Sequence, residues 1–214
     1  MNTGILNLHL DILDNKRQEL LQKLLPVLGD FVLGGGTALA LQLKHRKSFD
    51  FDFFSSSRIP KRLLEKLSQN VTIKNVVIDT SDELTFFTTD DIKITFLYYP
   101  FKQHFKIMEL ENGLCIFSIQ EIALQKAYTI GRRGEYRDYF DLYTILKNNY
   151  MEIGELISLA KEIYGSVFDK KLFLEQLVYF GDLSNFDIIP VSGKILPKIE
   201  DIKQYFEELA RKLI

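Results

Sequence analysis

Two short stretches of the sequence carry side chains that could do chemistry. In the second of them, residues 48–54 (SFDFDFF), phenylalanine and aspartate alternate. Side chains of a β-strand point alternately to its two faces, so Asp50 and Asp52 are expected on one face and the phenylalanines on the other. The carboxylates would then stand roughly 6 to 7 Å apart at their Cα atoms. This pair suits a Mg²⁺ ion that carries nucleotide phosphates, because Mg²⁺ takes a few protein oxygens together with substrate oxygens.

The first stretch lies just upstream and could bind the phosphates themselves. Gly34, Gly35 and Gly36 stand where an apolar strand around residues 31–33 turns into a helix that is expected to begin near Thr37. A helix N-terminus presents unpaired N–H groups to an anion, and glycine lets a phosphate approach the backbone closely. A phosphate-binding turn followed by paired carboxylates is the combination that nucleotidyl transfer requires.

Each feature also has an ordinary structural explanation. Glycines before a helix more often serve only the turn, and an Asp-x-Asp pair on an amphipathic strand is often just its hydrated face. The basic run at residues 44–47 suits the last turn of a solvated helix. The combination of turn, helix and paired carboxylates in this order is more specific than any of its parts, and it favours the functional interpretation.

The stretch from Gly34 to Phe54 resembles the first motif of the AbiEii/AbiGii-type nucleotidyltransferase toxins, a branch of the DNA polymerase beta-like superfamily. In that family a Gly-Gly-Thr/Ser turn precedes a short helix and an Arg-x-Ser-x-Asp-x-Asp strand. The resemblance implies that the two aspartates are catalytic and bind Mg²⁺, and that the other matching residues bind the nucleotide. The matching residues are Gly35, Gly36, Thr37, Arg46, Ser48, Asp50 and Asp52.

A second block resembles the later motifs of the same family. These motifs carry a lysine on one helix and an Arg/Lys-Asp-x-x-Asp-Leu-Tyr signature on the next, which here correspond to Lys126 and to residues 137–143. The resemblance implies that Lys126 contacts the triphosphate and that Asp138 and Asp141 help to organise the active site, with Asp138 favoured.

The residues of the second block allow simpler interpretations as well. A lysine on a helix is usually exposed, and Arg137 and Asp141 are spaced to form an i, i+4 pair. Alternatively, the arginines at 132, 133 and 137 could neutralise both aspartates.

One position departs from the superfamily pattern. Polymerase beta-like enzymes usually add a third carboxylate from a later strand, which here should be the strand at residues 92–98. One face of that strand presents Lys93, Thr95 and Leu97, none of which is acidic, and Asp91 is in phase only at the start of the strand. Two alternatives stay open, an enzyme with one well-held Mg²⁺ and a catalytically degenerate relative.

Composition indicates an ordinary globular protein. The chain has 214 residues, of which 46% are hydrophobic and 26% charged, with a net charge of -2. This length can bury one sizeable core or two smaller ones. No apolar run is long enough for a membrane span, and the N-terminus lacks the features of a secretory signal. The single cysteine, Cys115, is expected to be a buried, inert thiol, and a cytoplasmic location is expected.

Periodicity predicts an α+β fold. The expected class is a polymerase beta-like nucleotidyltransferase core, a mixed sheet with flanking helices, at residues 1–117. A helical region that contributes to the active-site cleft is expected at 118–214, opened by a capping box at Ser118-Ile119-Gln120-Glu121. The expected helices are 6–28, one from Thr37, 60–69, 118–130 and 136–146, followed by helical pieces. The expected strands are 31–33, one around Asp50, 71–78, 84–89, 92–99 and one or two short strands up to Phe117.

The sequence thus predicts a Mg²⁺-dependent nucleotidyltransferase that moves a nucleoside monophosphate from a nucleoside triphosphate to a hydroxyl. The acceptor is expected to be an RNA, with tRNA among the candidates, or a protein. The resemblance implies the toxin of a toxin–antitoxin (abortive infection) system with a cognate antitoxin as partner. The alternatives are a catalytically degenerate relative that binds nucleotide or partner, and a nucleotidyltransferase that acts on a small molecule.

Overall fold

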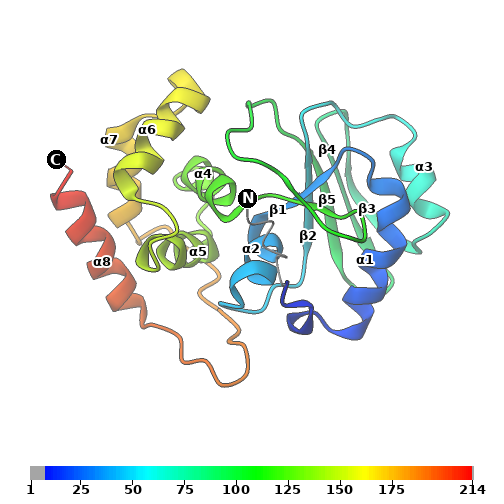
Figure 1. The fold of residues 1–214 in the computed structure, drawn as a ribbon, viewed down its shortest axis with the longest axis horizontal. Coiled ribbons are helices and arrows are strands. Elements are labelled where there is room, and N and C mark those ends of the chain that lie inside the picture. The colour runs from blue at the N-terminus through cyan, green and yellow to red at the C-terminus, as the bar shows by residue number, and fades with distance from the viewer. Residues whose placement is uncertain (1–7, 214) are drawn as a thin grey trace. The chain divides into compact units, whose positions relative to one another are not determined.

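The computed structural model describes residues 8–213, and contacts divide the chain into two compact units (Figure 1). The sheet unit comprises the residues up to Lys102 together with Lys106–Ser118. The helical unit comprises Gln103–Phe105 together with the residues from Ile119 onward.

The sheet unit is built on one mixed, seven-stranded sheet with the strand order β3-β4-β5-β2-β1-β7-β6. Strand β1 pairs antiparallel with β2 and parallel with β7, while β2 pairs parallel with β5. The strands are β1 (Val32–Gly34), β2 (Phe51–Ser55), β3 (Ile73–Asp79), β4 (Glu83–Thr88), β5 (Lys93–Tyr98), β6 (Met108–Glu109) and β7 (Cys115–Ile116). Cys115, expected to be buried, is half-buried on a short strand near the sheet edge.

One face of this sheet carries the main apolar core. Because paired residues on neighbouring strands point to the same face, the register between β4, β5 and β2 gathers one set of apolar side chains there, and all of them are fully buried. They are Phe51, Phe53, Leu84, Phe86, Ile94 and Phe96. The rings of Phe53 and Phe96 stack with their centroids 5.2 Å apart.

Among the residues from 8 onward, three helices and one short 3-10 turn complete the sheet unit. They are η1 (Leu10–Ile12), α1 (Asn15–Leu28), α2 (Gly35–Leu43) and α3 (Leu63–Ser68). The predicted single helix over residues 6–28 was wrong at its start: Asp14 caps α1 by accepting a hydrogen bond from the backbone N–H of Arg17, and such a cap fixes the beginning of a helix. Leu6 lies outside the described residues.

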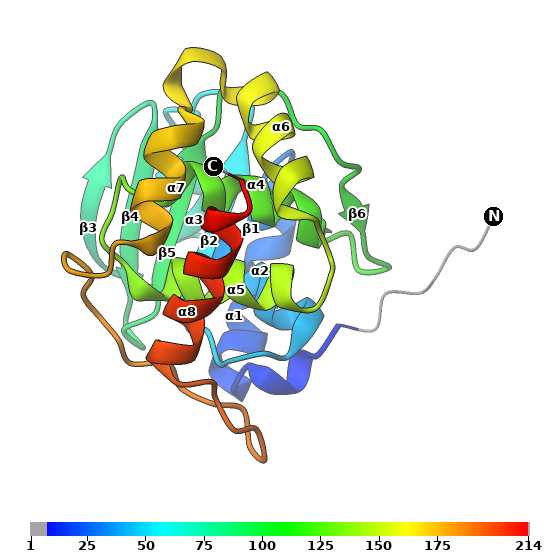
Figure 2. The ribbon, with the colours of Figure 1, turned by 90° about the vertical axis from the view of Figure 1, so that its left-hand side faces the viewer.

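The helical unit contains five α-helices within the part of the chain that the structure describes, together with the turn η2 (Gly165–Val167). They are α4 (Ile119–Thr129), α5 (Tyr136–Lys147), α6 (Ile153–Tyr164), α7 (Lys170–Val178) and α8 (Ile199–Arg211). Helix α4 packs on α5 and α6, and α8 packs on α5 and α7; Figure 2 shows α8 beside α7. Tyr139 is buried in this core against the rings of Phe180 and Phe206.

Glu121, predicted as part of a capping box, joins two segments of this unit. Its side chain is buried, and Oε2 accepts hydrogen bonds from the backbone N–H groups of His104 and Phe105. Burial raises the pKa of Glu121, and these two hydrogen bonds act against that rise. The short segment 103–105 is thereby attached to α4. No helix among residues 8–213 is long and apolar enough to span a membrane.

Candidate functional site

The turn from β1 into α2 is tighter than the sequence predicts. Strand β1 continues to Gly34, and α2 begins at Gly35 rather than near Thr37. Gly34 therefore both ends the strand and caps the helix. It has no room for a side chain, because a Cβ atom there would lie 2.6 Å from the ring of Phe54. The helix N-terminus thus starts directly from the sheet, with no intervening loop.

Gly35 brings this helix N-terminus against Asp52. Gly34 pairs with Asp52 in the β1–β2 register, and a Cβ atom on Gly35 would lie 2.7 Å from Oδ2 of Asp52. Gly35 also has a φ of +62°, a conformation that L side chains rarely adopt. The half-buried Asp52 carboxylate therefore lies at the first turn of α2.

Asp50 stands immediately before β2 rather than inside it. Its backbone carbonyl accepts a hydrogen bond from Oγ1 of Thr37, and the same hydroxyl lies 2.8 Å from Oγ of Ser48. Thr37 and Ser48 are both buried. These bonds hold the segment that carries Asp50 against the first turn of α2. Between the two half-buried aspartates, Phe51 is fully buried in the core.

The remaining motif residue of the sheet unit, Arg46, is buried as well, and its Nη1 donates to the backbone carbonyl of Lys47. Thr37, Arg46 and Ser48 are thus buried, whereas Gly35 and Gly36 are half-buried. The contacts of Thr37 and Ser48 suit residues that hold a binding turn in shape.

Strand β5 lies next to β2 and presents Thr95 in register with Asp52. The next strand, β4, presents Thr85 in register with Thr95. The sheet position beside Asp52 is therefore occupied by a threonine. Asp91 lies in the turn before β5, where its exposed carboxylate pairs with Lys74 at 2.6 Å.

The carboxylates of Asp50 and Asp52 fit a magnesium site with few protein ligands. Within residues 8–213, no group of three or more histidine, cysteine or acidic side chains could hold a metal ion. Asp50 and Asp52 offer two carboxylates, and the glycine turn beside Asp52 leaves its oxygen clear of any side chain at position 35. Mg²⁺ commonly binds through one or two carboxylates together with substrate phosphates, so the residues present are compatible with this ion.

The residues of the second block form a buried ion cluster in the helical unit. Lys126 on α4 places its Nζ 2.7 Å from Oδ1 of Asp138 and 2.7 Å from Oδ2 of Asp141, both on α5. Arg133 completes the cluster, with Nε 2.7 Å from Oδ2 of Asp138 and Nη2 2.9 Å from Oδ1. Because Asp138 and Asp141 are three residues apart, one face of α5 presents both carboxylates.

Burial distinguishes the members of this cluster. The side chains of Lys126, Asp138 and Asp141 are 5%, 2% and 0% exposed, whereas that of Arg133 is 58% exposed. Burial acts to raise the pKa of Asp138, but the charges of Lys126 and Arg133 outweigh it and hold this pKa below its ordinary value. Asp138 is therefore ionised at neutral pH despite its burial.

The cluster agrees with one of the simpler interpretations drawn from the residues. Of the three arginines considered, Arg133 pairs with Asp138, whereas Arg137 pairs with Glu135. The expectation that a lysine on a helix is exposed was wrong for Lys126, whose two carboxylate partners allow its burial. Contact of Lys126 with a triphosphate stays a prediction.

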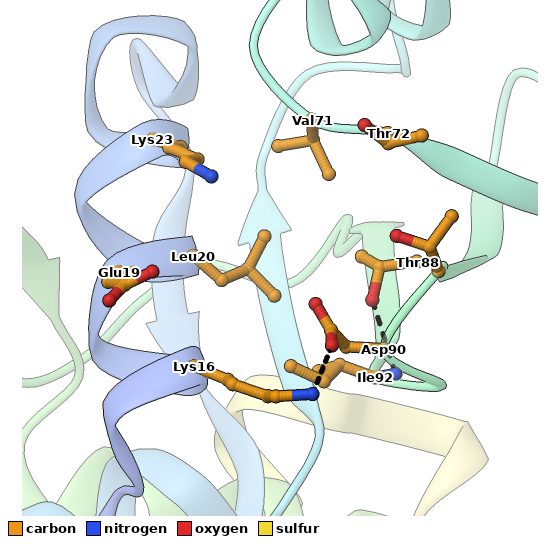
Figure 3. Close-up of a pocket in the computed structure, with 10 residues that line it drawn as sticks. Lys16, Glu19, Leu20, Lys23, Val71, Thr72, Thr88, Asp90 and Ile92 are labelled. Atoms are coloured by element: carbon orange, nitrogen blue, oxygen red, sulfur yellow. Dashed lines mark hydrogen bonds and ion pairs between the residues drawn. The ribbon is translucent and has the colours of Figure 1, made fainter.

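A separate pocket of about 80 Å³ lies between α1 and the β4–β5 turn of the sheet unit (Figure 3). Leu20, Val71 and Ile92 form its apolar lining, and Lys16 pairs with Asp90 at its edge at 2.5 Å. Thr88 also lines it and is in phase with Leu84 and Phe86 on β4. The pocket is therefore on the opposite face of the sheet from Asp52.

Comparison with known proteins identifies the family of this chain. Residues 20–210 match the family model described as the nucleotidyl transferase AbiEii toxin of type IV toxin–antitoxin systems. The uncharacterised protein aq_aa25 of Aquifex aeolicus (strain VF5) is 30% identical over 212 residues, which cover 94% of this chain and 98% of that protein.

Two solved structures share the fold. A candidate nucleotidyltransferase from H. pylori has a TM-score of 0.54 at 20% identity, over 94% of this chain and 99% of that one. JHP933 from Helicobacter pylori has a TM-score of 0.50 at 19% identity, over 92% and 95%. The mixed sheet with flanking helices and a C-terminal helical region is thus a nucleotidyltransferase fold. The chain belongs to the AbiEii nucleotidyltransferase family.

Proposed function

We propose that this protein is a Mg²⁺-dependent nucleotidyltransferase that transfers a nucleoside monophosphate from a nucleoside triphosphate to a hydroxyl group. The observation that carries the proposal is the contact between Gly35, at the N-terminus of α2, and the carboxylate of Asp52. A helix N-terminus attracts phosphate, but a phosphate beside an ionised carboxylate would be repelled. A divalent cation between the two anions removes this conflict, so the geometry supports a metal–nucleotide complex.

The sheet unit would bind the nucleotide through the residues of the first motif. Backbone N–H groups of Gly35 and Gly36 would donate to phosphate oxygens, and Thr37 and Ser48 would keep this turn in shape through their hydrogen bonds. Arg46 would be a further nucleotide-binding residue. Asp50 and Asp52 would hold Mg²⁺, which when bound offsets negative charge on the phosphates. Glycine at position 35 also leaves the Asp52 carboxylate undisplaced, since a Cβ atom there would lie 2.7 Å from its Oδ2.

Lys126, Asp138 and Asp141 are proposed as the residues of the helical unit on which activity depends, with Lys126 as a further nucleotide contact. Their close pairing, with N–O distances of 2.7 Å, supports a fixed arrangement of the three side chains. Loss of one partner from a buried ion pair is strongly destabilising. Activity of a variant such as Lys126→Ala is therefore informative only alongside its free energy of unfolding.

The family also suggests a class of acceptor and a biological role, which we propose here. The family description implies a nucleotide substrate and a cognate antitoxin, and we propose that the acceptor is an RNA, such as a tRNA, or a protein side chain. We further propose that the protein acts as a toxin in the cytoplasm, where nucleoside triphosphates are available.

A second candidate function has one observation in its favour. Strand β5, on which the resemblance predicts a third carboxylate, presents Thr95 beside Asp52. A catalytically degenerate relative would keep the nucleotide site and act through binding alone. Such a protein would bind a nucleoside triphosphate but label no acceptor.

The test incubates the purified protein with Mg²⁺, total RNA and cell lysate, and with each labelled nucleoside triphosphate in turn. We expect label in an RNA or protein band, and its loss in Asp50→Asn and Asp52→Asn variants that keep their thermal stability. Asp79→Asn is the matched control, because Asp79 is an exposed aspartate on β3 of the same sheet. Persistence of labelling in both site variants would show that the metal assignment is wrong.

A further inference from the structure

We propose that Arg17, on α1, is a positioning residue of the metal site, because it holds the backbone segment that presents Asp50. This inference rests on the proposed function, since it concerns the same ion at Asp50 and Asp52. Arg17 belongs to neither of the two motifs, and it lies 32 residues before Phe49, which it contacts. It acts on the ion only through the position of Asp50.

The sheet fixes Asp52 but not Asp50. Strand β2 begins at Phe51, and Asp52 within it pairs with a residue of β1 on one side and of β5 on the other. Residues 44–50, between α2 and β2, form neither helix nor strand. The direction in which Asp50 points therefore depends on contacts made by its own segment.

Both peptide groups that flank Asp50 are held, each from a different helix. The carbonyl of Phe49, which belongs to the peptide group before Asp50, accepts a hydrogen bond from Nε of Arg17 at 2.9 Å. The carbonyl of Asp50 accepts a hydrogen bond from the hydroxyl of Thr37 on α2. Because each peptide group is planar, fixing both of them restricts the two backbone dihedral angles of Asp50.

Arg17 also contacts the side chain of Phe49. Its guanidinium carbon lies 4.8 Å from the centroid of the Phe49 ring, in a cation–π contact. The backbone and the ring of the residue before Asp50 are thus both held by one side chain.

The guanidinium of Arg17 is itself held in place at the start of α1. Asp14, which caps this helix, accepts hydrogen bonds from the backbone N–H of Arg17 through Oδ1 and from Nη1 through Oδ2. The side chain of Arg17 is only 16% exposed. Since the guanidinium is planar and rigid, its bond to Asp14 also fixes the direction in which Nε donates to Phe49.

Removal of Arg17 should therefore weaken metal binding. Loss of a group that orients a metal ligand typically weakens metal binding by about 10- to 100-fold. The charge of Arg17 acts in the opposite direction, because removal of a cation by itself favours the binding of another cation. Weaker binding without Arg17 is thus a mark of positioning and not of charge.

The experiment measures the dissociation constant of Mn²⁺ in the presence of a non-hydrolysable nucleoside triphosphate analogue, by electron paramagnetic resonance of the free ion. In Arg17→Met, which keeps an apolar side chain but no donor or charge, we expect Mn²⁺ to bind about 10- to 100-fold more weakly. Excess Mn²⁺ should restore nucleotide transfer by this variant, because both aspartates are present. It should not restore transfer by Asp50→Asn.

Leu24→Val is the control for a general loss of stability. Leu24 is fully buried on the same helix, so its shortening removes core packing without touching the segment before β2. This variant should bind Mn²⁺ as the wild type does. A loss of affinity equal to that of Arg17→Met would overturn the inference, because destabilisation alone would then explain both.

The other outcomes separate this inference from the proposed function. Unchanged Mn²⁺ affinity in a folded Arg17→Met variant, or transfer that excess Mn²⁺ does not restore, would overturn the positioning role and leave the Asp50/Asp52 site intact. Absence of Mn²⁺ binding by the wild type would overturn the proposed metal site and this inference with it. If Arg17→Met does not fold, Arg17→Lys decides, because lysine keeps the charge but not the planar group. Weaker Mn²⁺ binding by this variant would support the inference, and unchanged binding would overturn it.

Discussion

Gly35 shows how strongly a single residue can constrain the site. It combines a φ of +62° with a contact in which any Cβ atom would lie 2.7 Å from the Asp52 carboxylate. A positive φ in a residue other than glycine costs about 1–2 kcal/mol, and the contact adds a displacement of the carboxylate itself. Glycine is thus required both by the backbone and by the site.

We therefore predict that Gly35→Ala lowers the free energy of unfolding by about 1–3 kcal/mol and abolishes nucleotide transfer. Gly29→Ala is the matched control, because Gly29 has a φ of +52° with nothing within 4 Å of an added Cβ atom. This control should lose comparable stability and keep its activity. Denaturant unfolding and the labelling assay measure the two effects. An active Gly35→Ala variant would contradict the proposed role of the turn.

At the scale of elements, a buried cluster of charged side chains joins helices α4 and α5. Two carboxylates and the ammonium of Lys126 are removed from water, which is costly unless the ions pair closely. Their N–O distances of 2.7 Å meet that condition. The partly exposed Arg133 supplies the second positive charge, so the cluster as a whole is neutral.

This cluster predicts a specific pH dependence of stability. The pKa of Asp138 is lowered on folding, so its ionised form stabilises the native state fully above the unfolded value of about 3.9. That contribution is lost as pH falls below about 4 and through the lower folded pKa. We expect Asp138→Asn to be less stable than the wild type at pH 7 by about 3–5 kcal/mol, and the difference to shrink at low pH.

Urea unfolding at pH 7, 5, 4 and 3 measures this difference. Glu175→Gln serves as the control, since Glu175 is an exposed carboxylate on α7 that lies 3.8 Å from the ammonium of Lys171. Its unfolding free energy should follow that of the wild type at every pH. A stability gap for Asp138→Asn that stays constant down to pH 3 would show that the lowered pKa does not stabilise the fold.

At the scale of the whole molecule, binding of metal and nucleotide should be coupled to stability. The carboxylate of Asp52 and a bound triphosphate are both anions at one helix N-terminus, so each ligand should bind better with the other present. Ligand at 100 times its dissociation constant stabilises a protein by about 2.7 kcal/mol. We predict that Mg²⁺ and a nucleoside triphosphate together raise the melting temperature by more than the sum of their separate effects.

Thermal unfolding with each ligand alone, with both and after addition of EDTA measures this coupling. Asp52→Asn should raise the melting temperature with both ligands by no more than the sum of the separate rises. Asp79→Asn should show the same additional rise as the wild type. Equal stabilisation by the triphosphate with and without Mg²⁺ would contradict the metal–nucleotide arrangement and leave the fold assignment unaffected.

Much of the local structure is determined by the sequence alone. The alternation at residues 50–54 predicts that Phe51 and Phe53 are buried, and both are fully so. The strands expected at 84–89 and 92–99 agree within one residue with β4 and β5, and the helix at 136–146 agrees with α5. These features follow from side-chain period and turn residues, which act over a few neighbouring positions.

Other features depend on contacts between residues that are distant in sequence. The placement of Asp52 between Gly34 and Thr95 follows from strand register across three elements. The burial of Lys126 follows from carboxylates 12 and 15 residues away on another helix. The sequence alone determined which residues carry the charges and which elements hold them. Only the tertiary structure decided which charges meet, because pairing and burial are properties of packed neighbours rather than of local sequence.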